Sequence, residues 1–207
     1  SEIQDFIYFS SVKAVADTVE ETLGENVIGN PKTPYGQSKL QAEDYILAQK
    51  LPEGKRIFII RPCMIHGPGN KGNLNLLYNI VKKGIPYPLA SFENERSFLS
   101  IDNLNFLINA ILSDNTIASG IYNFADDVVI STNELVKIIA KASGKEARLL
   151  KVPKGLINAG AKLGDFIKLP LNSETVKKLT ENYRVSNDKI KRAIGIEKLP
   201  TSASEGL

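Results

Sequence analysis

The sequence predicts an α/β protein with a parallel sheet, and three observations carry that prediction. Two short apolar runs, residues 6–9 and 56–61, have the composition of buried strands. Segments with helical periodicity follow these runs, so that strands and helices alternate along the chain. The 207 residues are 43% hydrophobic and 24% charged, which is ordinary for a globular protein with a sizeable core.

The expected elements follow one another with few ambiguities. Asp102 is a suitable N-cap for a helix at residues 103–112, because a carboxylate can accept a backbone N–H. Gly144 is placed to end a helix at residues 132–142, since glycine readily adopts the conformation of a C-cap. The first strand is expected to be covered on both faces. Strands are predicted at residues 6–10, 56–61, 98–101, 121–124 and 149–152, and helices at 35–50, 73–83, 103–112, 132–142, 154–167, 173–181 and 187–193.

Composition argues against several classes of function. A formal charge of +3 without a long Lys/Arg run gives no basis for a nucleic-acid partner. No apolar run approaches the ~18–20 residues that span a bilayer, so no membrane partner is expected. Cys63 is the only cysteine, which fits a reducing cytoplasm. With His66 the only histidine, neither a metal site nor a Cys–His catalytic pair is expected.

The strongest candidate for chemistry is the segment Tyr-Gly-Gln-Ser-Lys at residues 35–39. On a helix, side chains four residues apart lie on one face, so the Tyr35 phenol and the Lys39 ammonium point into the same space. A phenol with its ordinary pKa of about 10 is a poor base at neutral pH. A neighbouring cation favours the phenolate, which makes the pair a candidate acid/base. A hydroxyl from Ser10 or Ser11 could bind the substrate oxygen whose proton is moved.

A tyrosine and a lysine at this spacing also occur together by chance, as a half-exposed aromatic beside a solvated lysine. The surrounding sequence separates the two interpretations. A buried strand ends in Ser10-Ser11, a long polar loop leads to the pair, and a second buried strand ends in Arg61-Pro62 before a glycine-rich loop. The order of these features favours the catalytic interpretation.

This ordered set resembles the extended short-chain dehydrogenase/reductase family of NAD-dependent epimerases and dehydratases, and within it the UDP-sugar 4-epimerases most. In that family a strand ends in paired hydroxyl residues, Tyr-Gly-x-Ser-Lys follows, and the next strand carries Arg-Pro before a Gly-Pro-Gly-like segment. The resemblance covers nearly the whole chain. The matching residues are Ser10-Ser11, Tyr35 to Lys39, Arg61-Pro62, His66-Gly67-Pro68-Gly69, Asn73-Leu74-Asn75, Arg96-Ser97-Phe98, Ile101-Asp102-Asn103-Leu104 and Ile121-Tyr122-Asn123-Phe124.

The resemblance implies catalytic and cofactor roles for several of these residues. Tyr35 would be the acid/base at the sugar hydroxyl, and Lys39 would hold the nicotinamide ribose. Ser11, preferred over Ser10, would hydrogen-bond the reacting oxygen. Pro62 would pack near the nicotinamide, so Tyr35, Lys39 and Pro62 form the expected cofactor contacts.

The resemblance also implies a substrate side. Asn73 and Leu74 would lie beside the nucleotide of the substrate, and the Arg96 guanidinium would face its diphosphate. The family's Arg-x-Gly-Asp phosphate clamp is not evident around residues 182–186, which leaves the second phosphate contact open.

Two departures from the family pattern lie just after the serines. Residues 14–17 read Ala-Val-Ala-Asp where the family has Val-Tyr-Gly, so the register near Ser11 is open by one residue. Sugar 4,6-dehydratases place an Asp-Glu pair after the hydroxyl residue, whereas this chain has Val12-Lys13. That pair performs the acid/base work of water elimination, so dehydration is not expected.

The family's glycine-rich dinucleotide fingerprint lies far upstream of its catalytic tyrosine, where the backbone approaches the pyrophosphate at a helix N-terminus. Tyr35 is too near the first residue for this segment to be present, so the chain is expected to be a fragment. Residues 67–72 also satisfy Gly-x-Gly-x-x-Gly, precede a helix and have Glu93 downstream. Because the preceding strand ends early, at Arg61-Pro62, and no βαβ unit follows, this run is interpreted as a substrate-side turn.

The predicted fold is therefore the C-terminal part of a Rossmann-like parallel sheet with a small mixed α/β substrate-binding lobe. Residues 1–63 would be the second part of the dinucleotide-binding domain, and residues 64–207 mainly the lobe. The expected reaction of the intact protein is NAD-dependent C4 epimerisation of a UDP-hexose or UDP-N-acetylhexosamine through a 4-keto intermediate, with NADP left open. The alternatives are a nucleotide-sugar 4-ketoreductase or dehydrogenase, and a non-catalytic dinucleotide-sensing protein. The family also favours a homodimer through the Tyr35-bearing helix.

Overall fold

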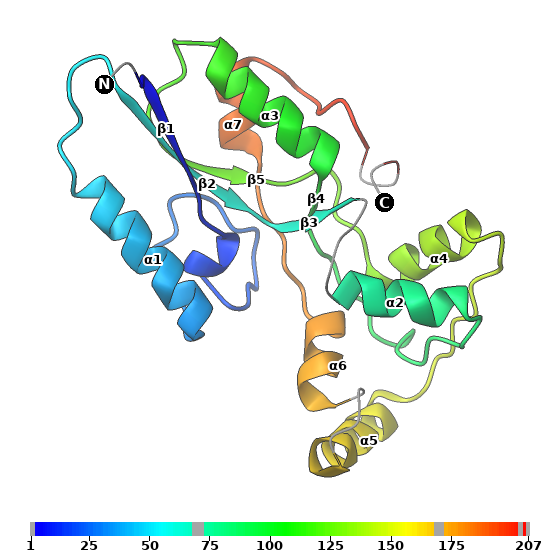
Figure 1. Ribbon diagram of the computed structural model, residues 1–207. Coiled ribbons are helices and arrows are strands. Elements are labelled where there is room, and N and C mark those ends of the chain that lie inside the picture. The colour runs from blue at the N-terminus through cyan, green and yellow to red at the C-terminus, as the bar shows by residue number, and fades with distance from the viewer. Residues whose placement is uncertain (1–2, 68–72, 168–171, 203–204, 206–207) are drawn as a thin grey trace. The chain divides into compact units, whose positions relative to one another are not determined.

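The computed structural model describes residues 3–67, 73–167, 172–202 and 205, and it confirms the α/β prediction (Figure 1). No helix among these residues is both long and apolar enough to cross a membrane. The strands are β1 (Asp5–Phe9), β2 (Arg56–Pro62), β3 (Met64–His66), β4 (Phe98–Ser100) and β5 (Gly120–Phe124). The helices are the 3₁₀ turn η1 (Val12–Ala14) and α1 (Pro34–Leu47), α2 (Asn73–Lys82), α3 (Ile101–Ser113), α4 (Thr132–Ala142), α5 (Lys154–Ile167), α6 (Ser173–Thr180) and α7 (Asp188–Ile194).

The chain forms two compact units that alternate along the sequence. Unit 1 comprises Ser1–Gly67, Ser97–Val129 and Tyr183–Gly206, and it contains the five strands named above together with α1, α3 and α7. Unit 2 comprises Pro68–Arg96 and Ile130–Asn182, with α2, α4, α5 and α6. These units are defined by packing and not by function. The division into a dinucleotide-binding part (residues 1–63) and a substrate-binding lobe (residues 64–207) therefore stays a prediction.

The main sheet of unit 1 has the strand order β1-β2-β5 and is parallel throughout. Its register pairs Phe9 with Ile60 and Ile60 with Tyr122. The shorter strands β3 and β4 form a separate parallel pair. Among the described residues β1 lies at an edge, and Phe6 and Phe9 are exposed. β1 is thus only partly covered in the described chain, and its expected burial within a larger sheet stays a prediction.

The pleat of β2 sends alternate side chains to two different layers. Phe58 and Ile60 belong to the main apolar cluster, which includes Leu107 of α3 and Ile190 of α7. Arg61 points the other way and binds Glu43 of α1. Figure 1 shows the same arrangement, with α1 on one side of the sheet and α3 and α7 on the other. One face of β2 is thus core and the other supports α1.

Two local predictions are wrong in detail. Ser100, not Asp102, is the N-cap of α3, since the Ser100 hydroxyl accepts the Asn103 N–H at 3.1 Å and Asp102 lies in the first turn. The strand predicted at residues 149–152 is reduced to two isolated bridges, Tyr87 with Leu149 and Leu89 with Lys151. The first bridge is parallel and the second antiparallel, so they do not join into one strand.

The loop between β1 and α1 packs tightly against the first turn of α1. A Cβ at Gly36 would lie 2.4 Å from the Lys13 carbonyl oxygen and 2.6 Å from the Pro31 Cβ. The Asn30 N–H donates to the Val15 carbonyl at 2.8 Å, which closes the loop on itself. The residue that follows Tyr35 therefore needs to be small so that this backbone can approach.

We expect Gly36→Ala to lower the free energy of unfolding by about 1–3 kcal/mol, because the added methyl group forces backbone apart. The matched control is Gly155→Ala in α5, where an added Cβ has nothing within 4 Å. That control should be neutral or stabilising by up to ~1 kcal/mol, as alanine favours a helix over glycine. Urea unfolding of both variants measures the difference, and equal stability of Gly36→Ala and the natural protein would contradict the packing argument.

Candidate active site

The first two turns of α1 place Tyr35 and Lys39. Thr33 is the N-cap, its hydroxyl accepting the Gly36 N–H at 3.3 Å, and Pro34 occupies the first helical position. Tyr35 is 54% exposed. The Lys39 ammonium lies 6.0 Å from the Tyr35 ring centroid and donates to the Phe9 carbonyl at 2.9 Å. The structure thus brings the predicted pair together beside the carboxyl end of β1.

The two serines after β1 differ in their surroundings. Ser10 is buried, and its hydroxyl donates to the Glu43 carboxylate. Ser11 is half-buried and is the N-cap of η1, its oxygen accepting the Lys13 N–H at 3.2 Å. A hydroxyl has one proton to donate, and Ser10 uses its proton inside the protein. Ser11 uses its oxygen as an acceptor, and its proton remains available to a ligand.

Pro62 lies near the same edge of the sheet. It is the last residue of β2, is buried, and is paired with Phe124 of β5. Phe9 of β1 is paired with Ile60 of β2. Ser11 and Pro62 therefore each lie two residues beyond this pair, at the same end of the sheet. Ligands of parallel α/β sheets bind beyond the carboxyl ends of the strands, and that is where both residues lie.

The predicted substrate residues belong to unit 2. Leu74 is half-buried in α2, and Arg96, also half-buried, donates to the Lys178 carbonyl. Asn73 begins α2, but its side chain lies outside the described part of the chain. Most of the glycine-rich run at residues 67–72 also lies outside the described residues. The roles of these residues stay predictions.

A buried ion pair that sequence reasoning missed lies beneath α1. The Arg61 Nε is 3.0 and 3.1 Å from the two carboxylate oxygens of Glu43, and the exposed fractions of the two side chains are only 4% and 1%. Glu43 also accepts the Ser10 hydroxyl proton. The sequence does indicate that Glu43 belongs near the predicted pair, because Tyr35, Lys39 and Glu43 follow one another at four-residue intervals on one helix face.

Asp17 fastens the loop to the start of α1. Its carboxylate accepts the Lys32 N–H at 2.6 Å and the Thr33 hydroxyl at 2.7 Å. Burial alone would raise the pKa of Asp17, but these hydrogen bonds and the nearby Lys13 ammonium hold the pKa below its ordinary value. Asp17 lies in the stretch where the sequence departs from the family pattern, and its role is to anchor the N-cap residue of α1.

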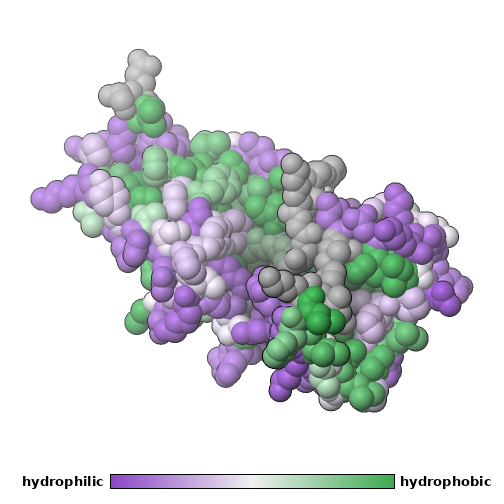
Figure 2. Space-filling model, turned by 60° about the horizontal axis from the view of Figure 1, so that its bottom comes forward, coloured by the Kyte–Doolittle hydropathy of each residue, from purple (hydrophilic) through white to green (hydrophobic). Residues whose placement is uncertain are grey.

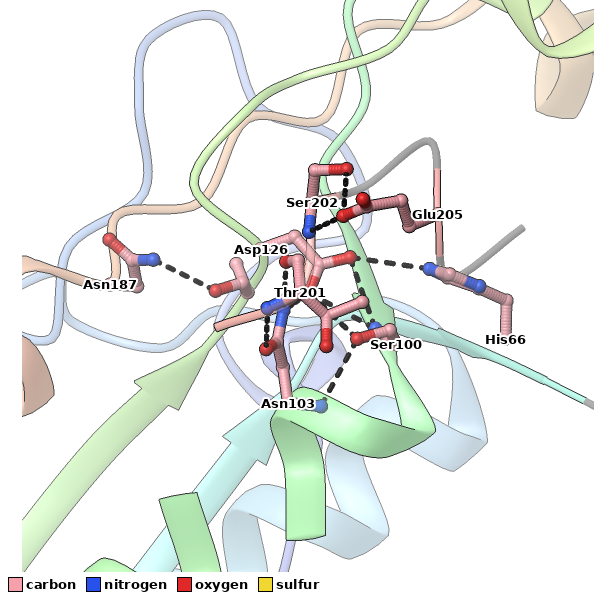
Figure 3. A network of polar contacts seen from close by, with 9 residues as sticks. His66, Ser100, Asn103, Asp126, Asn187, Thr201, Ser202 and Glu205 are labelled. Atoms are coloured by element: carbon pink, nitrogen blue, oxygen red, sulfur yellow. Dashed lines mark hydrogen bonds and ion pairs between the residues drawn. The ribbon is translucent and has the colours of Figure 1, made fainter. Parts of the chain in front are cut away.

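A second buried network in unit 1 is structural (Figure 3). The Asp126 carboxylate accepts the Ser100 N–H at 3.0 and 3.1 Å and the Asn103 side-chain amide at 2.7 Å, and it lies 3.2 Å from His66 Nε2. Asn103 in turn binds the backbone of Thr201 at both ends of its amide. These contacts join the ends of β3, β4 and β5 to the C-terminal segment. No three His, Cys, Asp or Glu side chains of the described ranges gather as a metal site would require.

Comparison with known proteins decides the family. The model of the 3-beta hydroxysteroid dehydrogenase/isomerase family matches residues 1–152, which is more than half of the chain. The chain belongs to this family. The match confirms the short-chain dehydrogenase resemblance drawn from the motifs at residues 10–11, 35–39 and 61–62.

Two of the relatives that this chain matches are named as sugar 4-epimerases. A UDP-glucose 4-epimerase of Vibrio cholerae is 32% identical over 209 residues, which cover 100% of this chain and 62% of that protein. The N-acetyl-alpha-D-glucosaminyl-diphospho-ditrans,octacis-undecaprenol 4-epimerase of Escherichia coli O157:H7 is 28% identical over 192 residues, which cover 92% of this chain and 55% of that protein. The chain thus spans less than two thirds of the length of both relatives.

The solved structures show the same fold. The UDP-glucose 4-epimerase of Thermus thermophilus in complex with NAD superimposes with a TM-score of 0.68 at 21% sequence identity. The superposition covers 98% of this chain and 61% of that one.

Removing the charge of Glu43 should destabilise the protein strongly. We expect Glu43→Gln to cost about 3 kcal/mol of unfolding free energy, because it leaves the Arg61 guanidinium buried without its counter-ion. The double variant Glu43→Met/Arg61→Met should recover much of that loss, since it buries no unpaired charge. Urea unfolding of Glu43→Met, Arg61→Met and the double variant measures the coupling, and additive losses would contradict a direct pair.

The Asp17 contacts give a pH dependence of stability. Because the folded-state pKa of Asp17 is lowered, its stabilising contribution is present above the unfolded-state pKa and is lost as pH falls through the folded-state pKa. We expect Asp17→Asn to be less stable than the natural protein by about 1 kcal/mol at neutral pH. The difference should begin to narrow below about pH 4, near the unfolded-state pKa, and vanish once the pH is below the lower folded-state pKa. Thermal unfolding across this pH range tests it, and a difference that persists in acid would contradict the ionic origin.

Proposed function

We propose that this chain carries the catalytic residues of an NAD-dependent epimerase that inverts C4 of a nucleotide sugar through a 4-keto intermediate. The observation that carries the proposal is the position of the Lys39 ammonium, which binds the Phe9 carbonyl at the end of β1 and lies near the Tyr35 ring. Ser11 follows the same strand. The names of the Vibrio cholerae and Escherichia coli relatives, both 4-epimerases, support the same reaction.

The donor chemistry of these residues fits a nicotinamide dinucleotide. An ammonium has three protons, and Lys39 gives one of them to Phe9. Its other protons suit the vicinal hydroxyls of a ribose, and the family resemblance would place Pro62, which has no N–H, near the nicotinamide. When bound, NAD supplies reversible hydride acceptance, which the amino acids themselves do not provide.

The protein side chains would handle the proton of the C4 hydroxyl. Tyr35 would take this proton as the alcohol becomes a ketone and return it when the alcohol re-forms with the opposite configuration. Lys39 would stabilise the phenolate form of Tyr35 by its positive charge. The Ser11 hydroxyl would donate to the C4 oxygen and hold it beside Tyr35. Proton and hydride both return to the sugar, so the net reaction is redox-neutral.

The substrate side of the proposal rests on the family resemblance. Residues 64–207 would form most of a lobe for a UDP-hexose or UDP-N-acetylhexosamine, with Asn73 and Leu74 beside the nucleotide and Arg96 facing the diphosphate. Two exposed apolar side chains of α1, Tyr45 and Leu47, support a homodimer through this helix. The single cysteine, Cys63, is buried and cannot form a disulfide within the chain, which fits a cytoplasmic location.

The test is proton NMR of the full-length protein incubated with NAD and UDP-N-acetylglucosamine, and separately with UDP-glucose. We expect a new C4-epimer signal from the natural protein. Tyr35→Phe should lower turnover by about 10²–10⁴-fold, as expected for the loss of an acid/base. The matched control is Tyr45→Phe, which changes another exposed tyrosine of the same helix and should leave turnover unchanged.

Equal turnover by Tyr35→Phe would contradict the assignment of the acid/base. Absence of turnover by a folded, NAD-bound protein with both sugars would contradict the epimerase proposal. Oxidation of NADH or NADPH by a 4-keto nucleotide sugar would then identify a ketoreductase.

A further inference from the structure

Helix α5 in unit 2 exposes a run of large apolar side chains. Four of them, spread along the helix, are more than half exposed: Leu156 (66%), Leu163 (63%), Phe166 (90%) and Ile167 (59%). Single exposed apolar residues are normal on a protein surface, but a contiguous group on one element marks an interaction site. Figure 2 shows apolar side chains gathered over the region of unit 2 that includes this helix.

The apolar residues of α5 form two separate faces. Ile157, Ala161 and Gly164 are buried and attach the helix to its own unit. At 3.6 residues per turn, Phe166 projects opposite this buried face, and Leu156, Leu163 and Ile167 lie beside Phe166, roughly 100° around the helix from the buried face. One apolar face is therefore used for folding, and a second one remains exposed.

The charges in the stretch of chain that contains α5 are mostly positive. Five of the seven charged residues between positions 145 and 167 are Lys or Arg. Lys154 and Lys162 are exposed on α5 itself, on the side between its two apolar faces. The one acid of the helix, Asp165, is occupied by the N–H and hydroxyl of Ser173, at 2.9 and 2.7 Å. The helix thus presents an apolar face with a basic border.

We propose that α5 docks on the surface of an anionic lipid bilayer. A helix that lies in a membrane interface inserts Phe and Leu side chains at the boundary between headgroups and acyl chains, while Lys side chains on its polar side contact anionic headgroups. α5 has both features in this arrangement. The helix has 14 residues and would lie along the surface rather than cross the bilayer.

The same face fits a second copy of the chain less well. A stable dimer interface buries about 800 Å² on each partner, which is more than four side chains of one short helix expose. Lysines bordering the face would also repel the lysines of an identical copy across a symmetric contact. An anionic membrane surface would contact the apolar face through its acyl chains and the basic border through its headgroups. The proposal revises the expectation of no membrane partner, and it does not depend on the proposed reaction.

Sedimentation of the full-length protein with lipid vesicles tests the proposal. The probes are vesicles of phosphatidylcholine alone and of phosphatidylcholine with an equal amount of phosphatidylglycerol. We expect the natural protein to partition at least about tenfold more strongly onto the anionic vesicles, and less strongly as salt is added. The double variant Leu163→Glu/Phe166→Glu and the variant Lys162→Glu should each lose about tenfold or more of this binding.

The matched control is Leu112→Glu, which changes a leucine of α3 that is 49% exposed and lies in unit 1. It should bind anionic vesicles as the natural protein does. Circular dichroism verifies that the variants are folded, as expected for changes at exposed positions. Equal binding by the natural protein and the α5 variants, or no binding by either, would overturn the proposal. The proposal would also be overturned if the protein does not bind vesicles and sedimentation velocity shows an assembly that the double variant dissociates.

Discussion

The buried contact of Glu43 with Arg61 and Ser10 is the constraint on which the candidate active site depends. Each of its members is near a residue with a proposed role. Ser10 precedes Ser11, Arg61 precedes Pro62, and Glu43 lies one helical turn after Lys39. A charged pair in this environment tolerates little displacement, because separating it would leave charge buried without a partner. The buried group therefore places the end of β1, the end of β2 and the face of α1 relative to one another.

Short-range patterns in the sequence were sufficient to predict most of the elements and the proximity of Tyr35 and Lys39. Apolar runs located β1 and β2, and the four-residue spacing put Tyr35 and Lys39 on one helix face. The choice between Ser10 and Ser11 depends on burial, and only the structure shows that Ser10 is enclosed and bonded to Glu43. The partner of Glu43, Arg61, comes from strand β2, which is distant in sequence, and no local pattern indicates such a pairing.

The expectations that failed depend on tertiary context. Asp102 and Ser100 are both good N-cap residues, and Ser100 takes the position because its backbone N–H is already bound to Asp126. The run at residues 149–152 has strand composition but makes only isolated bridges. The alternation of the two units along the chain was also beyond local reasoning, since residues after position 182 return to pack in unit 1. Tyr183 illustrates this return, because its hydroxyl donates to the Ala16 carbonyl at 2.6 Å.

The central claim is that Tyr35, Lys39 and Ser11 serve an epimerisation in which the hydrogen at C4 leaves and returns as hydride. The most direct measurement uses UDP-N-acetylglucosamine with deuterium at C4, incubated with the full-length protein and NAD in ordinary water. Hydride held within the active site does not exchange with solvent, so the C4 epimer should retain its deuterium. An epimer that carries protium at C4 would contradict the claim, because the hydrogen would then have left as a proton.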